Sequence, residues 1–93
     1  MTNIYVVVVQ GVYRHEVIGA FDNYQLAVTA AQIAAGLEED GYHSYEVLAG
    51  LLNAPVDDME KVYSCYWQVE CIQDSESKRV LGYKKIKLLE HTE

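Results

Sequence analysis

Several features are scarce in this 93-residue sequence, and each scarcity excludes a class of protein. The sequence contains one proline, and apolar residues make up 51% of it, which argues against a disordered chain despite the net charge of −7. No apolar run approaches the roughly 18 residues that a transmembrane helix needs, and the N-terminus lacks the basic segment of a signal peptide. We therefore expect a single folded domain over residues 1–93, in the cytoplasm and not in a membrane.

Cysteine is also scarce, and its spacing argues against a disulfide. Cys65 and Cys71 lie on the same face of one expected strand. At about 3.3 Å per residue their Cα atoms would be about 20 Å apart, which is too far for a disulfide bond. We predict two free thiols, both buried beside Trp67, as expected in a reducing compartment.

The sequence lacks the motifs of metal binding and catalysis. The three histidines, His15, His43 and His91, do not have the spacing of zinc ligands. His15 and His43 would meet only if their strands were neighbours, and a polar pair on the sheet surface is the other interpretation. No serine lies in a glycine-rich elbow, and the glycines are scattered singly, so no phosphate-binding loop is present. We expect no enzyme activity, no cofactor and no metal.

Hydrophobic periodicity predicts the element order β-β-α-β-β-β. The expected strands are residues 4–9, 12–21, 42–52, 62–73 and 79–89. Residues 4–9 are apolar on both faces, which is typical of a central strand, and Gln10-Gly11 forms the turn that follows. The predicted fold class is α+β, an antiparallel sheet of about five strands with one helix packed on one face.

The helix is expected over residues 24–39, between a cap at Asp22 or Asn23 and a stop at Gly41. Its alanines allow a close approach to the sheet. Its end breaks a local rule, because Glu38, Glu39 and Asp40 crowd the negative end of the helix dipole. That arrangement should cost a few tenths of a kcal/mol to about 1 kcal/mol.

Basic charge is nearly absent from the first two thirds of the chain. Before Lys61 the only basic residue is Arg14, set against nine carboxylates, a net charge of −8. Five of the remaining six basic residues lie in the last expected hairpin, where lysines suit a sheet edge. This acidic balance disfavours direct nucleic-acid binding. The acidic residues either imitate phosphate charge and occupy a basic site on another protein, or only keep the domain soluble.

Eight tyrosines are present, and tyrosine supplies large amphipathic contact area at protein interfaces. Tyr42, Tyr45 and Tyr66 are the best candidates for exposed tyrosines. The other interpretation is that the tyrosines only cover a small sheet, with their hydroxyls in water.

Residues 11–21 read GVYRHEVIGAF; an alanine-rich helix, YHSYEV at residues 42–47 and PVDD at residues 55–58 follow. This pattern, over about residues 3–58, resembles a class of short proteins from bacteriophages and mobile elements with a hairpin, one helix and a return strand. The resemblance carries no enzymatic motif. It implies a viral accessory protein that works by binding in the bacterial cytoplasm, with antagonism of a host defence system as one recurring role.

The leading hypothesis is therefore a non-enzymatic, phage-like protein that inhibits a host defence or nucleic-acid-handling protein by covering a functional surface. The predicted partner-binding residues are Glu38, Glu39, Asp40, Tyr42, Tyr45, Asp57, Asp58 and Tyr66. One alternative is an oligomer that sequesters a small anionic nucleotide with Arg14, His15, Lys84 and Lys85, and another is a structural subunit. We expect a homodimer, because one helix leaves part of the sheet of so short a chain uncovered.

Overall fold

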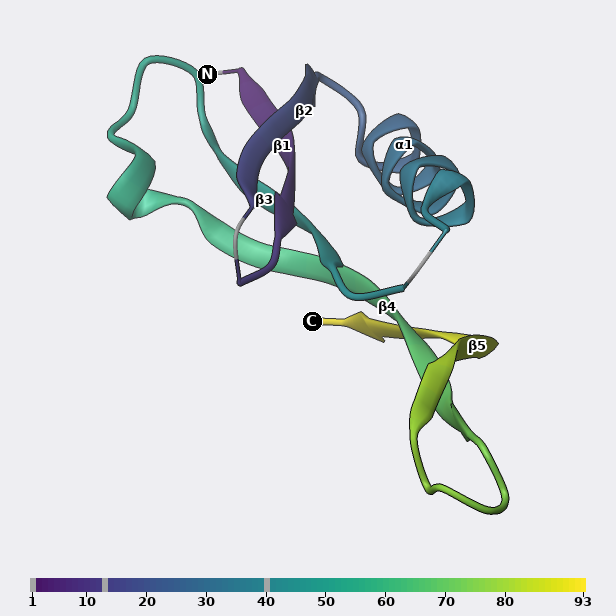
Figure 1. The fold of residues 1–93 in the computed structure, drawn as a ribbon. Helices are drawn as coiled ribbons and strands as arrows, with labels where there is room; N and C mark the ends of the chain where they lie inside the picture. Colours follow the sequence, from purple (N-terminus) through teal and green to yellow (C-terminus); the bar gives the residue numbers. More distant parts are fainter. Residues whose placement is uncertain (1, 13, 40) are drawn as a thin grey trace.

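The computed structural model describes residues 2–12, 14–39 and 41–93, and within these residues one helix lies against one antiparallel sheet (Figure 1). The elements are β1 (Asn3–Gln10), β2 (His15–Phe21), α1 (Tyr24–Leu37), β3 (Ser44–Leu51), the short 3-10 helix η1 (Val56–Asp58), β4 (Glu60–Gln73) and β5 (Val80–Thr92). This confirms the predicted α+β class and the β-β-α-β-β-β order.

The strand order in the sheet is β2-β1-β3-β4-β5, and each neighbouring pair is antiparallel. β1 lies between β2 and β3, which agrees with its run of valines and its prediction as a central strand. β5 is an edge strand, as its lysines predicted. Because β1 separates β2 from β3, His15 and the residues near His43 do not lie on neighbouring strands.

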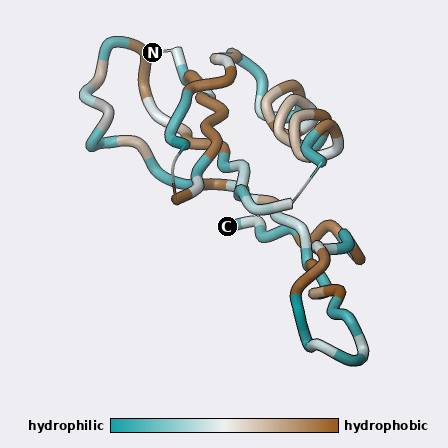
Figure 2. Tube along the Cα trace, in the orientation of Figure 1, coloured by the Kyte–Doolittle hydropathy of each residue, from teal (hydrophilic) through white to brown (hydrophobic). Residues whose placement is uncertain are grey.

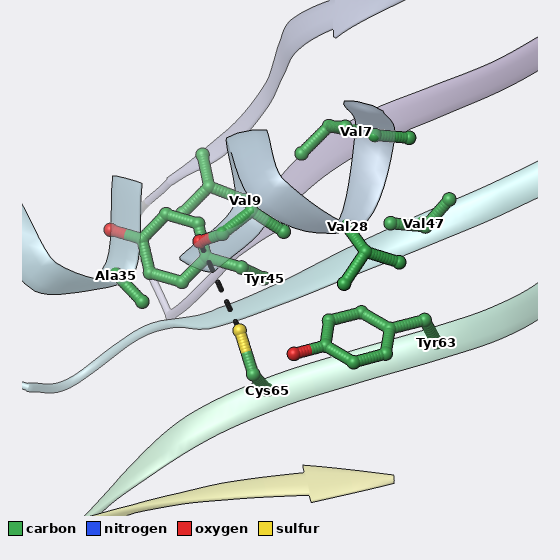
Figure 3. Close-up of a cluster of buried hydrophobic side chains, with 10 residues drawn as sticks. Val7, Val9, Val28, Ala35, Tyr45, Val47, Tyr63 and Cys65 are labelled. Carbon is green, nitrogen blue, oxygen red and sulfur yellow. Dashed lines mark hydrogen bonds between the residues drawn. The ribbon is translucent and has the colours of Figure 1, made fainter. Parts of the chain in front are cut away.

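The core fills the space between α1 and one face of the sheet (Figure 3). Alternate strand residues point to the same face, so this side of the sheet is lined by every second residue of β1, β3 and β4. They are Val7, Val9, Tyr45, Val47, Tyr63 and Cys65. The helix contributes mainly small residues, Ala27, Val28, Ala31 and Ala35, which allow it to lie so close that the Cys65 thiol donates to the Ala31 carbonyl at 3.9 Å.

The helix begins and ends close to the predicted residues. Asn23 is the N-cap, since its side-chain oxygen accepts a hydrogen bond from the Leu26 amide at 3.1 Å. The last helical residue is Leu37, two residues before the predicted end, and Glu38 is the C-cap. Gly41 lies beyond the cap with φ +75, where a Cβ atom would come within 3.2 Å of the Trp67 side chain. Gly41 therefore allows the chain to pass close to β4, where a larger residue would clash. It does not end the helix directly.

Two predicted strand limits were wrong by three residues, and the others differ by two residues or fewer. β2 begins at His15 and not at Val12, because the Gly11 amide donates to the Arg14 carbonyl at 2.8 Å and closes a turn there. Tyr13 lies outside the described residues. β5 continues to Thr92 and not only to Leu89, because Thr92 still pairs with Tyr63 of β4.

The last hairpin extends beyond the rest of the sheet. β4 pairs with β3 only from Glu60 to Tyr66, and beyond that point β4 and β5 pair only with each other. We call residues 67–87 the arm, which projects away from the helix and the other strands in Figure 1. The molecule measures 60 × 22 × 20 Å, and its radius of gyration is 15.8 Å. A compact chain of this length has a radius of gyration of about 12 Å, so the arm makes the molecule elongated.

Both cysteines are free, as predicted, but only Cys65 is buried. The predicted burial of Cys71 was wrong, because β4 runs past the end of the helix before it reaches this residue. In the part of the chain that the structure describes, no helix is long and apolar enough to cross a membrane.

Candidate functional site

The arm exposes large apolar side chains on a strand pair with no covering layer. They are Ile72, Val80, Leu81, Tyr83 and Ile86. Figure 2 shows the same feature as stretches of hydrophobic colour within both strands of the arm. Other exposed apolar side chains lie on β2, where Val17 is exposed, and on α1, where Leu26 and Leu37 are exposed. Several exposed large apolar side chains on one strand pair favour an interaction surface there.

The arm also has two free backbone edges. β5 has no second neighbour along its length, and β4 has none beyond Tyr66 in the described sheet. Unpaired amide and carbonyl groups along such edges accept an added strand from another chain. The arm can therefore bind a partner by main-chain hydrogen bonds as well as by its side chains.

A hydrogen-bonded turn closes the tip of the arm. The Asp74 amide donates to the Arg79 carbonyl at 2.8 Å, and the Lys78 amide donates to the Asp74 carbonyl at 3.0 Å. The Ser77 hydroxyl donates to Asp74 Oδ2 at 2.8 Å, which holds the pKa of the Asp74 carboxyl below its ordinary value. The polar turn predicted at residues 74–77 is present.

The arm is basic on a protein that is otherwise acidic. Residues 67–87 contain five basic and three acidic residues, a net charge of +2, and the rest of the chain contains two basic and eleven acidic residues, a net charge of −9. This distribution favours an acidic partner surface for the arm.

Two side chains at the base of the arm bind the end of α1. The Trp67 indole donates to the Ala35 carbonyl at 2.8 Å, and the Lys85 ammonium donates to the Glu38 carbonyl. The ammonium also lies 4.7 Å from the centroid of the Trp67 ring. A cation at this end of a helix is favourable. The expected conflict between the acidic residues and the helix dipole is therefore relieved by a lysine from β5.

A second feature is a cavity beside Glu38, between α1 and β2. Its volume is about 260 Å³, and it is lined by Arg14, Ile18, Ala34, Leu37, Glu38 and Tyr45. The Glu38 side chain is only 7% exposed, and its Oε1 accepts a hydrogen bond from His43 Nδ1. Its Oε2 is buried and has no hydrogen-bond partner among the described residues.

Tyr45 and Arg14 shape the polarity of this cavity. Tyr45 is 2% exposed, and burial, followed by the nearby Glu38 carboxylate, raises the pKa of its hydroxyl to about 12. Tyr45 therefore stays neutral and keeps its proton as a hydrogen-bond donor. Arg14 binds Glu16 Oε2 through Nη2 at 3.1 Å, and this contact is the main cause of its raised pKa.

The predicted acidic surface was partly wrong. Glu38 is buried in its pair with His43, so it is not part of the surface, and Asp40 lies outside the described residues. Glu39 is exposed near the start of β3, whereas Asp57 and Asp58 are exposed in η1 beyond its other end. An eight-residue strand spans about 25 Å, so these residues do not form one patch.

The predicted tyrosine exposure is confirmed for two residues and wrong for one. Tyr42 and Tyr66 are exposed, and the Tyr42 ring packs edge-on against Tyr83 of the arm with a centroid distance of 5.3 Å. Tyr45 is buried, because the alternation of β3 places it on the helix side (Figure 3).

The four residues of the nucleotide alternative do not converge. Arg14 lines the cavity beside Glu38, and Lys85 binds the Glu38 backbone carbonyl. His15 lies on the other face of the sheet, where its Nδ1 contacts Gln10 Oε1 at 2.5 Å. Lys84 neighbours Lys85 in β5, so its side chain points to the opposite face of the arm.

Sequence reasoning missed the positioning roles of His43, Trp67 and Lys85. The signal for His43 was weak, because a histidine five residues after a glutamate is not a motif. Trp67 and Lys85 meet the end of α1 only through the register of β4 with β5, and that register is not encoded in any local pattern.

No group of three or more metal-binding side chains occurs in the described ranges. Comparison of the chain with protein-family models, with characterised proteins and with solved structures finds no match. The resemblance to short phage proteins therefore stays a prediction, and the argument about function rests on the arm and the Glu38 cavity.

Proposed function

We propose that this chain is a non-enzymatic binding protein that uses the arm to dock on another protein. The observation that carries this proposal is the exposed apolar surface of the arm, together with its free strand edges. Apolar side chains in contact with water raise the free energy of the monomer. A partner that covers them lowers that free energy and so binds favourably. The arm replaces the acidic residues as the proposed recognition surface.

The charge of the arm indicates the chemistry of the partner. Lys78, Arg79, Lys84 and Lys87 lie in the same arm as the exposed apolar side chains, so an apolar groove with an acidic rim fits best. The inhibition of a host protein in the bacterial cytoplasm is the setting that the sequence resemblance suggests, and the two free thiols agree with a reducing compartment.

A matched pair of variants tests the arm. Leu81 in the arm and Val17 in β2 are both 67% exposed, so a change to aspartate has the same local chemistry at both sites. We expect a partner captured from bacterial lysate by the unchanged protein to bind Val17→Asp normally and to bind Leu81→Asp at least about tenfold more weakly. Unfolding temperatures of both variants check that the fold is intact. Equal capture by Leu81→Asp and Val17→Asp contradicts the proposal.

A second copy of the chain is the second candidate partner, as expected for a homodimer or a structural subunit. The sheet face away from α1 carries Val6, Val8 and Leu48, and a hollow of about 250 Å³ there is lined by Val8, Val17 and Leu48, among others. The basic arm and the acidic remainder also give two copies complementary charge. Sedimentation separates the two ideas: self-association that Val17→Asp abolishes supports this face, and a monomer at micromolar concentration argues against it.

A further inference from the structure

We propose that the cavity beside Glu38 binds a small apolar α-amino acid, with the ligand ammonium on Glu38, the ligand carboxylate on Arg14 and the ligand side chain against Ile18 and Leu37. This site is separate from the arm and goes beyond the proposed docking function.

The first step is the unpaired oxygen of Glu38. Buried polar atoms in native proteins nearly always have a partner, and an exception calls for an explanation such as a missing ligand. Glu38 Oε2 is buried without a partner among the described residues, in a side chain that is 7% exposed and lines the cavity. Oε1 is already bound to His43, and the Tyr45 hydroxyl lies near the same carboxylate, so Oε2 still has acceptor capacity for an N–H or ammonium donor.

The second step is the guanidinium on the other side of the cavity. Arg14 contacts Glu16 Oε2 through Nε at 3.2 Å and Nη2 at 3.1 Å. No described residue accepts a hydrogen bond from its Nη1. A guanidinium binds carboxylates well, and Arg14 lines the same cavity as Glu38. The site thus offers donors on one side and a carboxylate acceptor on the other.

The third step is the size and polarity of the space. A volume of about 260 Å³ lies below the range of roughly 300–1,000 Å³ that holds drug-sized ligands, so the ligand must be small. Ile18, Ala34 and Leu37 supply the apolar part of the cavity lining. A small zwitterion with an aliphatic side chain matches the small volume, the two opposite charges and the apolar lining of the cavity.

The same geometry disfavours the anionic nucleotide of the earlier alternative. A phosphate carries no ammonium to meet Glu38, so its negative charge would face the buried Glu38 carboxylate uncompensated, and like charges at a buried group repel strongly. His15 and Lys84, which were expected to neutralise the phosphate, lie elsewhere. A simple anion is therefore a poor ligand because Glu38 repels it. A simple cation is also a poor ligand because Arg14 repels it.

Calorimetry and amide chemical-shift titration with three probes test the site. L-leucine carries both charges, isoamylamine keeps only the ammonium, and 4-methylpentanoate keeps only the carboxylate. We expect L-leucine to shift the amides of Arg14, Glu38 and Tyr45 and to bind at least about tenfold more tightly than either partial analogue. No shift at these residues up to about 10 mM L-leucine, or equal affinity for the three probes, overturns the proposal.

Variants make the test specific to the two charged groups. Glu38→Gln and Arg14→Gln should each weaken L-leucine binding at least about tenfold, whereas Glu39→Gln, in the exposed neighbour of Glu38, should leave it unchanged. Arg14 is half-exposed, so its variant keeps the test valid if Glu38→Gln fails to fold. Unchanged affinity in a folded Arg14→Gln or Glu38→Gln protein overturns the assignment, as does binding of adenosine monophosphate in place of L-leucine.

Discussion

At the scale of single residues, one polar network joins the helix to the last two strands. The Tyr63 hydroxyl and the Gln32 side-chain amide both donate to Glu90 Oε1, the latter at 2.7 Å. These hydrogen bonds, that of Tyr63 first, hold the pKa of Glu90 below its ordinary value. Burial, followed by the bond to Glu90, raises the pKa of Tyr63, so its hydroxyl keeps the proton that it donates.

This network predicts the pH dependence of a Tyr63→Phe variant. A carboxyl whose pKa is lowered in the folded state stabilises the protein above its ordinary pKa of 4.5, and that contribution is lost as the pH falls through the lowered value. Tyr63→Phe should raise the pKa of Glu90 and reduce the stability at neutral pH by about 1 kcal/mol. A side-chain NMR titration measures the shift. Asp74, whose pKa depends on Ser77, is the internal control and should not change.

At the scale of elements, the end of α1 depends on a side chain from β5. Lys85 supplies the cation that the sequence of the helix does not contain, and Trp67 supplies a second donor to the same end. The stability of the last helical turn is therefore coupled to the pairing of β4 with β5.

Lys85→Gln should weaken the last turn of α1 by about 1 kcal/mol, because the variant loses the charge near the helix end and over the Trp67 ring. Faster amide hydrogen exchange in residues 34–37 is the expected result. Lys84→Gln removes the same charge from the opposite face of the arm and should leave this exchange unchanged. Equal exchange rates in the two variants would show that Lys85 does not stabilise the helix end.

The order of the elements and the inward face of the first half of β4, with Tyr63 and Cys65, followed from local patterns. The alternation around Trp67 and the alanines of the helix predicted that the apolar face of this strand packs against the helix. The N-cap of the helix was predicted to be one of two neighbouring residues. The strand order and the register were not predictable, because they depend on contacts between distant segments. For this reason the exposure of Cys71, the burial of Tyr45 and the pairing of Glu38 with His43 were missed.

At the scale of the whole molecule, the arm and the core are nearly independent. Every residue of the buried core cluster lies outside residues 67–87, so removal of the arm leaves that cluster complete. Replacing residues 69–86 by an Asn-Gly turn joins Gln68 to Lys87, which already lie opposite each other.

The shortened protein should fold, lose about 1 kcal/mol with the Lys85 contact, and have a radius of gyration of about 12 Å instead of 15.8 Å. Small-angle scattering measures the size, and circular dichroism measures the fold. A shortened chain that fails to fold would mean that the arm is part of the folding unit. Loss of partner capture with the fold intact agrees with the proposed docking function.

The register shift between Gln68 and Val69, at the base of the arm, has an evolutionary consequence. An irregularity at this point twists the hairpin away from the sheet, so the side chains beyond it lie outside the buried core cluster. Substitutions at Leu81 or Ile86 then change the partner that the protein recognises and leave its folding stability nearly unchanged. We expect such a hairpin to diversify quickly when its target changes, while the valines beneath α1 stay the same.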